Sequence, residues 1–159
     1  MKKHILIVDD DASIRSSLQN ILADGDYDVT VAEDGDSAED NFAKADLLIL
    51  DLYLPVQDGW DILGHVNSNY PLLPVIIITG LVNQLDETTI PGASAFLEKP
   101  IEVPVLLRTI ERLLSQTPDE RLVEAGRNSS TWQMPLARSV AAEHRPKAVS
   151  RALKKLRTH

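Results

Sequence analysis

Five chemically active side chains come directly after short apolar segments of the sequence. Three are carboxylates, one is a hydroxyl and one is an amine: Asp9, Asp10, Asp51, Thr79 and Lys99. Three carboxylates brought together would repel one another unless a cation lay among them. Hard oxygen ligands of this kind suit Mg²⁺, which keeps some of its waters and often shares its coordination shell with a phosphate. A carboxylate can also attack phosphorus to form an aspartyl phosphate. The pattern therefore predicts a magnesium-dependent phosphoryl-transfer site.

The amine and the hydroxyl suit the anion in such a reaction. Lys99 would supply a fixed positive charge, and Thr79 would donate a hydrogen bond, to a phosphoryl group arriving at Asp51; Gly80 leaves room beside Thr79. Neutralising charge on the phosphoryl oxygens is the main source of catalysis in phosphoryl transfer. Each residue alone has a structural interpretation, since aspartates commonly cap helices and threonine favours strands. What favours phosphoryl transfer is that all of these residue types occur together, in order, at the ends of four segments.

The elements that must position these side chains alternate through residues 1–115. Apolar, β-branched runs predict strands at 4–8, 27–32, 47–50, 75–78 and 94–97. Helical periodicity follows most of them, at 14–22, 38–45, 60–66 and 103–114, and segment 84–90 could form one or two helical turns. Five such units imply a parallel sheet with helices on both faces. Sites in these sheets form beyond the carboxyl ends of the strands, so the five side chains are expected at one rim.

Four segments resemble the signature segments of the response-regulator receiver family. They are Ile7-Val8-Asp9-Asp10, Asp51-Leu52-Tyr53-Leu54-Pro55 with Asp58-Gly59, Ile78-Thr79-Gly80, and Phe96-Leu97-Glu98-Lys99-Pro100. The resemblance covers residues 4–115. It implies a flavodoxin-like, doubly wound, five-stranded parallel sheet with strand order 2-1-3-4-5.

The resemblance also implies a role for each acidic residue of the site. Asp51 matches the phosphoacceptor, and Asp9 and Asp10 match the acidic pair that holds Mg²⁺ directly or through water. Tyr53 occupies the position whose backbone carbonyl completes the metal shell. The phosphoryl group would come from a sensor histidine kinase or a phosphotransfer protein.

Further positions match the part of the family that responds to phosphorylation. Thr79 matches the switch hydroxyl, Lys99 the phosphate-binding lysine, and Phe96 the switch aromatic that turns inward. The Lys99–Pro100 bond resembles one that is usually cis in the family. A homodimer formed on phosphorylation is a further partner that the family allows. Tyr53 and Leu81 flank the site and cannot readily orient a hydrolytic water, which predicts a long-lived phosphoryl state.

The charge of the chain changes sign near residue 116. Residues 1–115 hold 7 Lys/Arg and 20 Asp/Glu, a balance of −13, whereas residues 116–159 hold 9 Lys/Arg and 4 Asp/Glu, a balance of +5. We therefore predict a receiver domain at 1–115 and a basic tail at 116–159. Opposite electrostatics indicate different partners, because only the tail would attract nucleic acid.

The tail has local helical signals. Thr117 can cap a helix with Pro118 at its first position, running from about 119 to 125 and ending at Gly126. Segments 136–141 and 149–156 also have helical spacing. Segment 146–156 faintly resembles the recognition helix of a helix-turn-helix, whose basic residues could contact DNA phosphates. The usual glycine of the turn is missing, and a solvated end or a partner-docking segment fits the same pattern.

Composition excludes several classes of protein. The absence of cysteine excludes disulfides and thiolate chemistry. The start of the chain has no long apolar stretch of the secretory type, and no run is long enough to cross a bilayer, so we expect a cytoplasmic protein without a membrane partner. Two other functions stay open: an aspartyl phosphatase and a receiver used only for docking. An aspartyl phosphatase would usually carry a second aspartate two residues after the nucleophile, where this chain has Tyr53. A receiver used only for docking would not need the complete set of site residues. We expect the chain to catalyse only its own phosphorylation and dephosphorylation.

Overall fold

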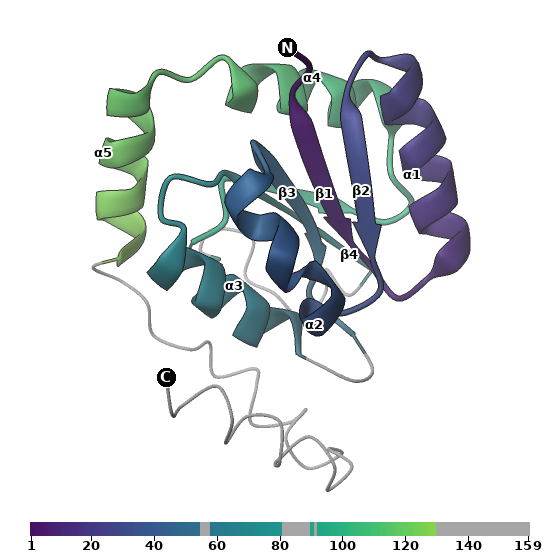
Figure 1. The fold of residues 1–159 in the computed structure, drawn as a ribbon, viewed down its shortest axis with the longest axis horizontal. Helices are drawn as coiled ribbons and strands as arrows, with labels where there is room; N and C mark the ends of the chain where they lie inside the picture. Colours follow the sequence, from purple (N-terminus) through teal and green to yellow (C-terminus); the bar gives the residue numbers. More distant parts are fainter. Residues whose placement is uncertain (55–57, 81–89, 91, 130–159) are drawn as a thin grey trace, which may run out of the picture.

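Five parallel strands form a single sheet in the order β2-β1-β3-β4-β5 (Figure 1). The computed structural model describes residues 1–54, 58–80, 90 and 92–129. The strands are β1 (His4–Val8), β2 (Asp28–Ala32), β3 (Leu47–Asp51), β4 (Val75–Thr79) and β5 (Ala95–Glu98). Their order and parallel pairing confirm the predicted flavodoxin-like sheet.

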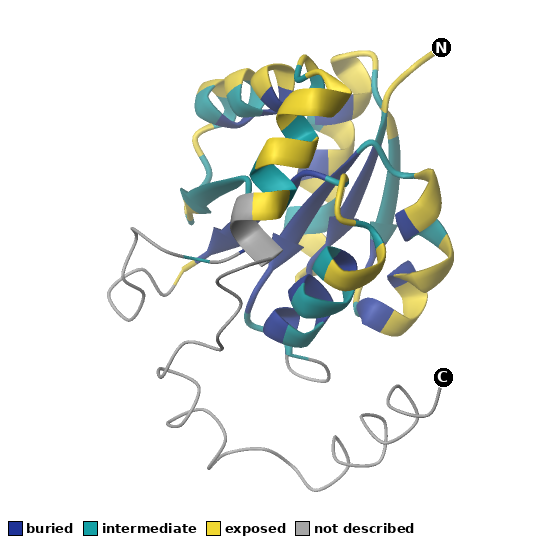
Figure 2. Cartoon of the chain, turned by 90° about the vertical axis from the view of Figure 1, so that its left-hand side faces the viewer, coloured by how far each residue is buried: buried dark blue, intermediate teal, exposed yellow. Residues whose placement is uncertain are grey.

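Helices cover both faces of this sheet. They are α1 (Ala12–Asp24), α2 (Gly35–Ala38), the 3₁₀ helix η1 (Glu39–Lys44), α3 (Gly59–Asn69), α4 (Val103–Leu114) and α5 (Pro118–Ser129). Buried residues of α1 and α4 pack into one apolar cluster, and those of α2, η1 and α3 pack into another. Figure 2 shows the buried strands between helices whose outer faces are exposed.

The continuous apolar runs of the strands are explained by these two clusters. Along β1, Ile5 and Ile7 belong to the cluster under α1 and α4, whereas Leu6 and Val8 belong to the one under α2, η1 and α3. Successive side chains of a strand point to opposite faces, so a strand covered on both faces must be apolar at every position. In the three inner strands β1, β3 and β4 the polar side chains are therefore confined to the strand ends, whereas the edge strand β2 has Thr30 at its centre.

Two predicted helices differ in detail. The segment at 38–45 is not one helix, because the four-residue α2 ends at Ala38 and η1 continues it as a 3₁₀ helix. Glycine, aspartate and serine make up most of α2 and favour helices weakly, which explains its shortness. The helix expected to end at Gly126 runs on to Ser129, since a single glycine weakens a helix without ending it. Of the 84–90 segment only residue 90 is described, and the 136–141 and 149–156 segments lie outside the described residues.

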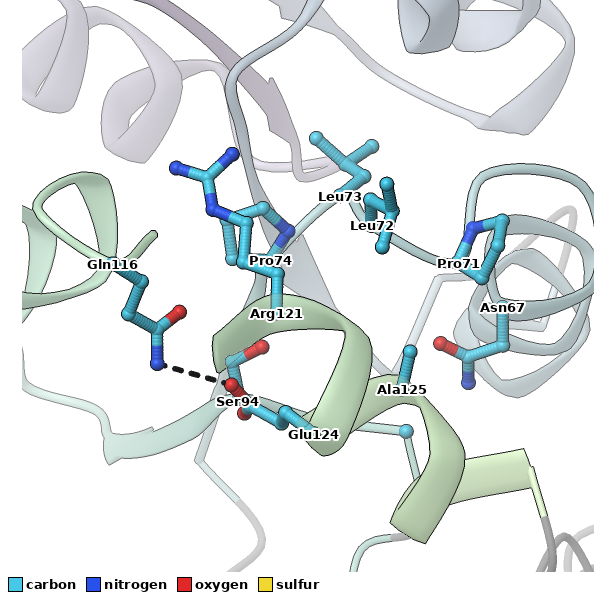
Figure 3. Close-up of a pocket in the computed structure, with 11 residues that line it drawn as sticks. Asn67, Pro71, Leu72, Leu73, Pro74, Ser94, Gln116, Arg121, Glu124 and Ala125 are labelled. Atoms are coloured by element: carbon cyan, nitrogen blue, oxygen red, sulfur yellow. Dashed lines mark hydrogen bonds between the residues drawn. The ribbon is translucent and has the colours of Figure 1, made fainter. Parts of the chain in front are cut away.

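Helix α5 folds back against the amino-terminal end of the sheet. Thr117 Oγ1 accepts the Glu120 N–H at 3.2 Å, and the Glu120 carboxylate accepts the Thr117 N–H at 2.8 Å, which confirms Thr117 as the cap. A small cavity of about 30 Å³ separates α5 from the end of α3 and from the segments before β4 and β5 (Figure 3). Gln116 Nε2 donates to Glu124 Oε2 at 3.1 Å beside it.

Among the described residues, no helix is long and apolar enough to span a membrane.

Candidate functional site

The ends of four strands bring the predicted site residues to one rim of the sheet. Asp9 and Asp10 follow β1, Asp51 ends β3, Thr79 ends β4, and Lys99 follows β5. One carboxylate oxygen from each of the three aspartates lies within 4.8 Å of the others. Because β1, β3 and β4 are neighbours in the sheet, residues far apart in the sequence meet here, as the topology predicted.

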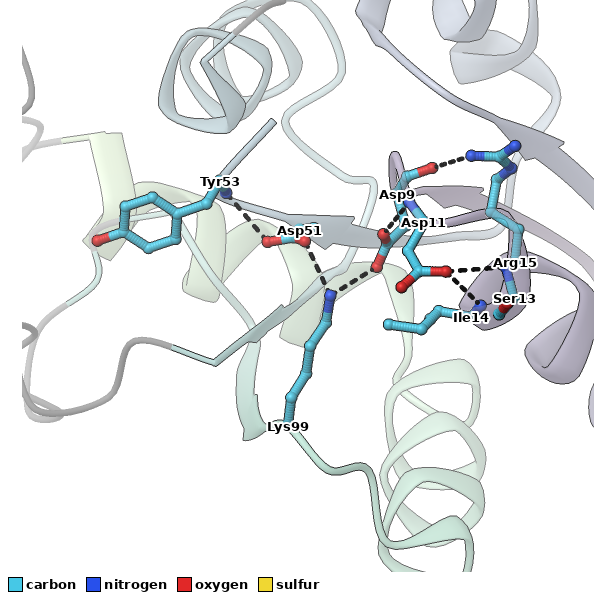
Figure 4. Close-up of polar contacts among 8 residues, drawn as sticks. All are labelled: Asp9, Asp11, Ser13, Ile14, Arg15, Asp51, Tyr53 and Lys99. Carbon is cyan, nitrogen blue, oxygen red and sulfur yellow. Dashed lines mark hydrogen bonds and ion pairs between the residues drawn. The ribbon is translucent and has the colours of Figure 1, made fainter. Parts of the chain in front are cut away.

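Asp51 is buried, with 6% of its surface exposed, and both of its carboxylate oxygens have partners. Oδ1 accepts the Tyr53 N–H at 3.0 Å, and Oδ2 accepts from Lys99 Nζ at 2.9 Å (Figure 4). Burial raises the pKa of Asp51 above its usual value, and the negative charge of Asp9 adds to this; the Tyr53 N–H and Lys99 only partly oppose it. The ionised form of Asp51 is therefore less favourable in this site than it would be in water.

The backbone N–H and both carboxylate oxygens of Asp9 are hydrogen-bonded. Its N–H donates to Ala32 O on β2, and its Oδ1 accepts the Asp11 N–H at 2.9 Å. Its Oδ2 accepts from Lys99 Nζ at 3.0 Å, so the lysine bridges Asp9 and Asp51. Burial by itself would lower the pKa of Lys99, but the hydrogen bonds and charges of the two carboxylates outweigh it and raise the pKa, which keeps the amine protonated.

The acidic cluster fits a divalent cation. Lys99 supplies one positive charge against three carboxylates, two of which are buried. Uncompensated charges of this kind are costly in a protein interior. Asp10 is exposed, and its side chain has no hydrogen bond within the part of the chain that the structure describes, so it is available as a ligand. An all-oxygen donor set with an open side matches the preferences of Mg²⁺.

The remaining predicted residues lie around this cluster. Thr79 is fully buried at the end of β4, and its carbonyl accepts the Lys99 N–H at 2.9 Å. Among the described residues a Cβ at Gly80 would meet only Lys99 Cβ, at 4.0 Å, so the packing of this part of the chain does not require glycine there. Phe96 is half-buried on β5 and packs against the cluster under α3. The Lys99–Pro100 bond is cis, as expected. Leu81 lies outside the described residues.

Two further residues shape the site: Gly59, which the sequence motifs include without a role, and Arg15, which they do not include. Gly59, the first residue of α3, would carry a Cβ only 2.4 Å from both Asp51 O and Leu52 Cα, so only glycine lets α3 start this close to the end of β3. Arg15 donates from Nη1 to Asp9 O at 2.7 Å. The sequence signal for Gly59 was the aspartate before it, because Asp58 caps α3 and so marks Gly59 as the first residue of that helix. The spacing of residues along the sequence gives no sign that Arg15 contacts Asp9.

Comparison with known proteins identifies the family. The response regulator receiver domain model matches residues 5–111. The response regulator MprA of Mycobacterium bovis is 34% identical over 146 residues, which cover 88% of this chain and 64% of that protein. A CheY-like receiver domain protein from Methanospirillum hungatei has 30% identity and a TM-score of 0.65, covering 78% of this chain and 99% of its own. The protein TrrA from Thermotoga maritima, solved in complex with Mg(2+)-BeF, has 26% identity and a TM-score of 0.64, covering 70% of this chain and 98% of its own.

These matches define a receiver domain, the regulated unit of two-component signalling. The chain belongs to the response regulator receiver domain family. It spans about 64% of the length of the MprA relative that it matches.

Proposed function

We propose that this chain is a response regulator that accepts a phosphoryl group on Asp51 from a sensor histidine kinase or a phosphotransfer protein. One observation carries the proposal. The buried Asp51 carboxylate at the end of the central strand is bound by Lys99 and has carboxylates of Asp9 and Asp10 within 4.8 Å. A structural aspartate would not be surrounded by two further carboxylates whose charges oppose its own.

The proposed reaction is a direct transfer to the carboxylate. A bond forms between a carboxylate oxygen of Asp51 and phosphorus as the bond from phosphorus to the donor's imidazole nitrogen breaks, and the nitrogen keeps the electron pair. Lys99 then donates to the phosphoryl group instead of to the carboxylate. The chain thus modifies itself and turns over no external metabolite.

Asp9, Asp10 and Asp51, with the backbone carbonyl of Tyr53, are the proposed ligands of Mg²⁺. When bound, the ion would supply positive charge beside the three carboxylates and the phosphoryl oxygens. The relative TrrA, solved with Mg(2+)-BeF, supports this choice of metal.

We propose that Thr79, Gly80, Lys99 and Phe96 form the switch that responds to the phosphoryl group. The burial of Thr79 beside the Lys99 backbone supports this, since a hydroxyl at that strand end can move toward a new anion and carry its neighbours with it. We further propose a cytoplasmic location, a receiver domain at 1–115 and a basic tail at 116–159.

A DNA-binding output through the tail is a second candidate, favoured by the balance of +5 in residues 116–159. A salt-dependent mobility shift with the full chain that disappears on deletion of residues 130–159 would support it. This deletion keeps α5, which packs on the receiver.

Intact mass spectrometry after treatment with acetyl phosphate tests the main proposal. We expect the full chain to gain one acid-labile phosphoryl group in Mg²⁺ and none in EDTA, and Asp51→Asn to gain none in either. Asp34→Asn is the matched control, because Asp34 caps α2 outside the acidic cluster and asparagine caps helices equally well. A wild-type chain that gains no phosphoryl group, or an Asp51→Asn chain that still gains it, refutes the proposal.

A further inference from the structure

The three carboxylates of the acidic cluster are restrained very unequally. Asp9 and Asp51 each accept one backbone N–H and share Lys99 Nζ. Asp10 is exposed, and within the described residues nothing hydrogen-bonds to its side chain. Its position therefore depends on the backbone that carries it, above all on the peptide group that joins it to Asp9.

Arg15 holds this peptide group. Its Nη1 donates to the carbonyl oxygen of Asp9 at 2.7 Å, the shortest of the contacts drawn around the cluster in Figure 4. The carbonyl of Asp9 belongs to the same planar unit as the N–H of Asp10. Fixing the carbonyl fixes the plane, and with it the N–Cα bond of Asp10 from which the side chain projects.

The helix that carries Arg15 is itself well anchored. Asp11 caps α1 by accepting the N–H groups of Ser13 and Ile14, at 2.8 and 3.3 Å, and the Arg15 N–H donates to Asp11 O at 3.0 Å in the first turn. Leu18 and Leu22 of the same helix are buried in the core. The Arg15 guanidinium thus reaches the Asp9–Asp10 peptide from a helix that is capped and packed into the core.

We propose that Arg15 is a positioning residue that holds the Asp9–Asp10 peptide so that both carboxylates face one divalent cation. This inference rests on the proposed function, because the cation is the one that phosphoryl transfer to Asp51 requires. Partners that orient metal ligands in this way commonly change metal affinity by about 10–100-fold when they are removed.

The charge of Arg15 makes the proposal unusually easy to test. A guanidinium beside an acidic cluster repels a cation, so removing it would strengthen Mg²⁺ binding if only the charge acted. Positioning predicts the opposite sign: loss of the hydrogen bond weakens binding although it also removes a positive charge. The direction of the change in affinity therefore separates the two effects.

The experiment is Mg²⁺ titration by calorimetry on the full-length wild type, Arg15→Met, Arg15→Gln and Arg15→Lys. Methionine, glutamine and lysine are good helix formers, so α1 should be retained. We expect Arg15→Met and Arg15→Gln to raise the Kd for Mg²⁺ about 10-fold and Arg15→Lys, which keeps a donor, to raise it less. Arg108→Met, which removes an exposed charge on α4, controls for net charge and should not weaken binding.

Two further readouts separate positioning from a general loss of structure. In metal-free protein, amide hydrogen exchange at Asp11, whose N–H donates to Asp9 Oδ1, should accelerate in Arg15→Met while exchange in β3 and β4 stays unchanged. Phosphorylation should need about 10-fold more Mg²⁺ for half-maximal rate but approach the wild-type rate at saturation. If Arg15→Met binds Mg²⁺ as tightly as wild type or more tightly, or if exchange at Asp11 does not change, Arg15 is not a positioning residue. A wild-type chain that binds no Mg²⁺ would instead refute the proposed function.

Discussion

Lys99 should be the main source of stability at the site when no divalent cation is present, and Lys99→Met tests this. Its Nζ lies 2.9 Å from Asp51 and 3.0 Å from Asp9, whose side chains are only 7% and 4% exposed. Removing one partner of a buried ion pair costs about 3–5 kcal/mol. Because the Lys99 side chain is itself 21% exposed, we expect a loss near the lower limit, about 3 kcal/mol. For a domain of this size that is a fall in melting temperature of roughly 10 °C.

The assay is thermal unfolding of the full chain in EDTA and in excess Mg²⁺. A divalent cation can replace the missing positive charge, so Mg²⁺ should raise the melting temperature of Lys99→Met more than that of wild type. Adding Asp51→Asn to Lys99→Met should recover part of the loss, because one of the two unpaired carboxylates is then gone.

The matched control is Lys2→Met. Lys2 lies 2.8 Å from Asp26, as close as the buried pairs, but the two side chains are 49% and 82% exposed, so little change is expected. Our reasoning is wrong if Lys99→Met melts within about 2 °C of wild type in EDTA, or if Mg²⁺ stabilises both proteins equally.

Two other changes probe the same rim of the sheet. Gly59→Ala would force a Cβ against the backbone of Asp51 and Leu52 and should cost about 3 kcal/mol in denaturant unfolding. The control is Gly126→Ala, whose added Cβ has no described atom within 4 Å and which should be neutral or stabilising. Equal effects of the two changes would contradict the close packing of α3 on β3. In metal-free buffer, Asp51→Asn should melt above wild type near pH 7. The folded-state pKa of Asp51 is raised, mainly by burial, so its contribution to stability is complete below the unfolded-state pKa and is lost as the pH rises through the folded-state pKa. Melting curves across pH should show the two proteins converging toward acid, and a constant difference would exclude this explanation.

The architecture was predictable because its signals are local and repeated. Continuous apolar runs such as 75–78 require a strand buried on both faces, and the two apolar clusters account for them. The parallel topology then brings Asp9, Asp51 and Lys99 to one rim without any knowledge of side-chain geometry.

The details that could not be predicted depend on how closely side chains and elements approach one another in the folded chain. Spacing does not reveal that the Arg15 side chain turns back to the Asp9 carbonyl, since this depends on its rotamer. The need for glycine at position 59 arises from the distance between α3 and β3. Tyr53 contributes a backbone N–H to Asp51, a contact that no residue type would indicate because every residue except proline has this donor.

The position of α5 bears on how a kinase and an output partner could share this molecule. Asp51 and α5 lie beyond opposite ends of strands that are five residues long, which separates them by about 16 Å of sheet. A partner whose contacts stay at the rim around Asp51 would therefore leave the surface around Glu124 and Ala125 uncovered. Both proteins could occupy the receiver at once, and α3, which starts against Asp51 and ends beside α5, is an element that contacts both places.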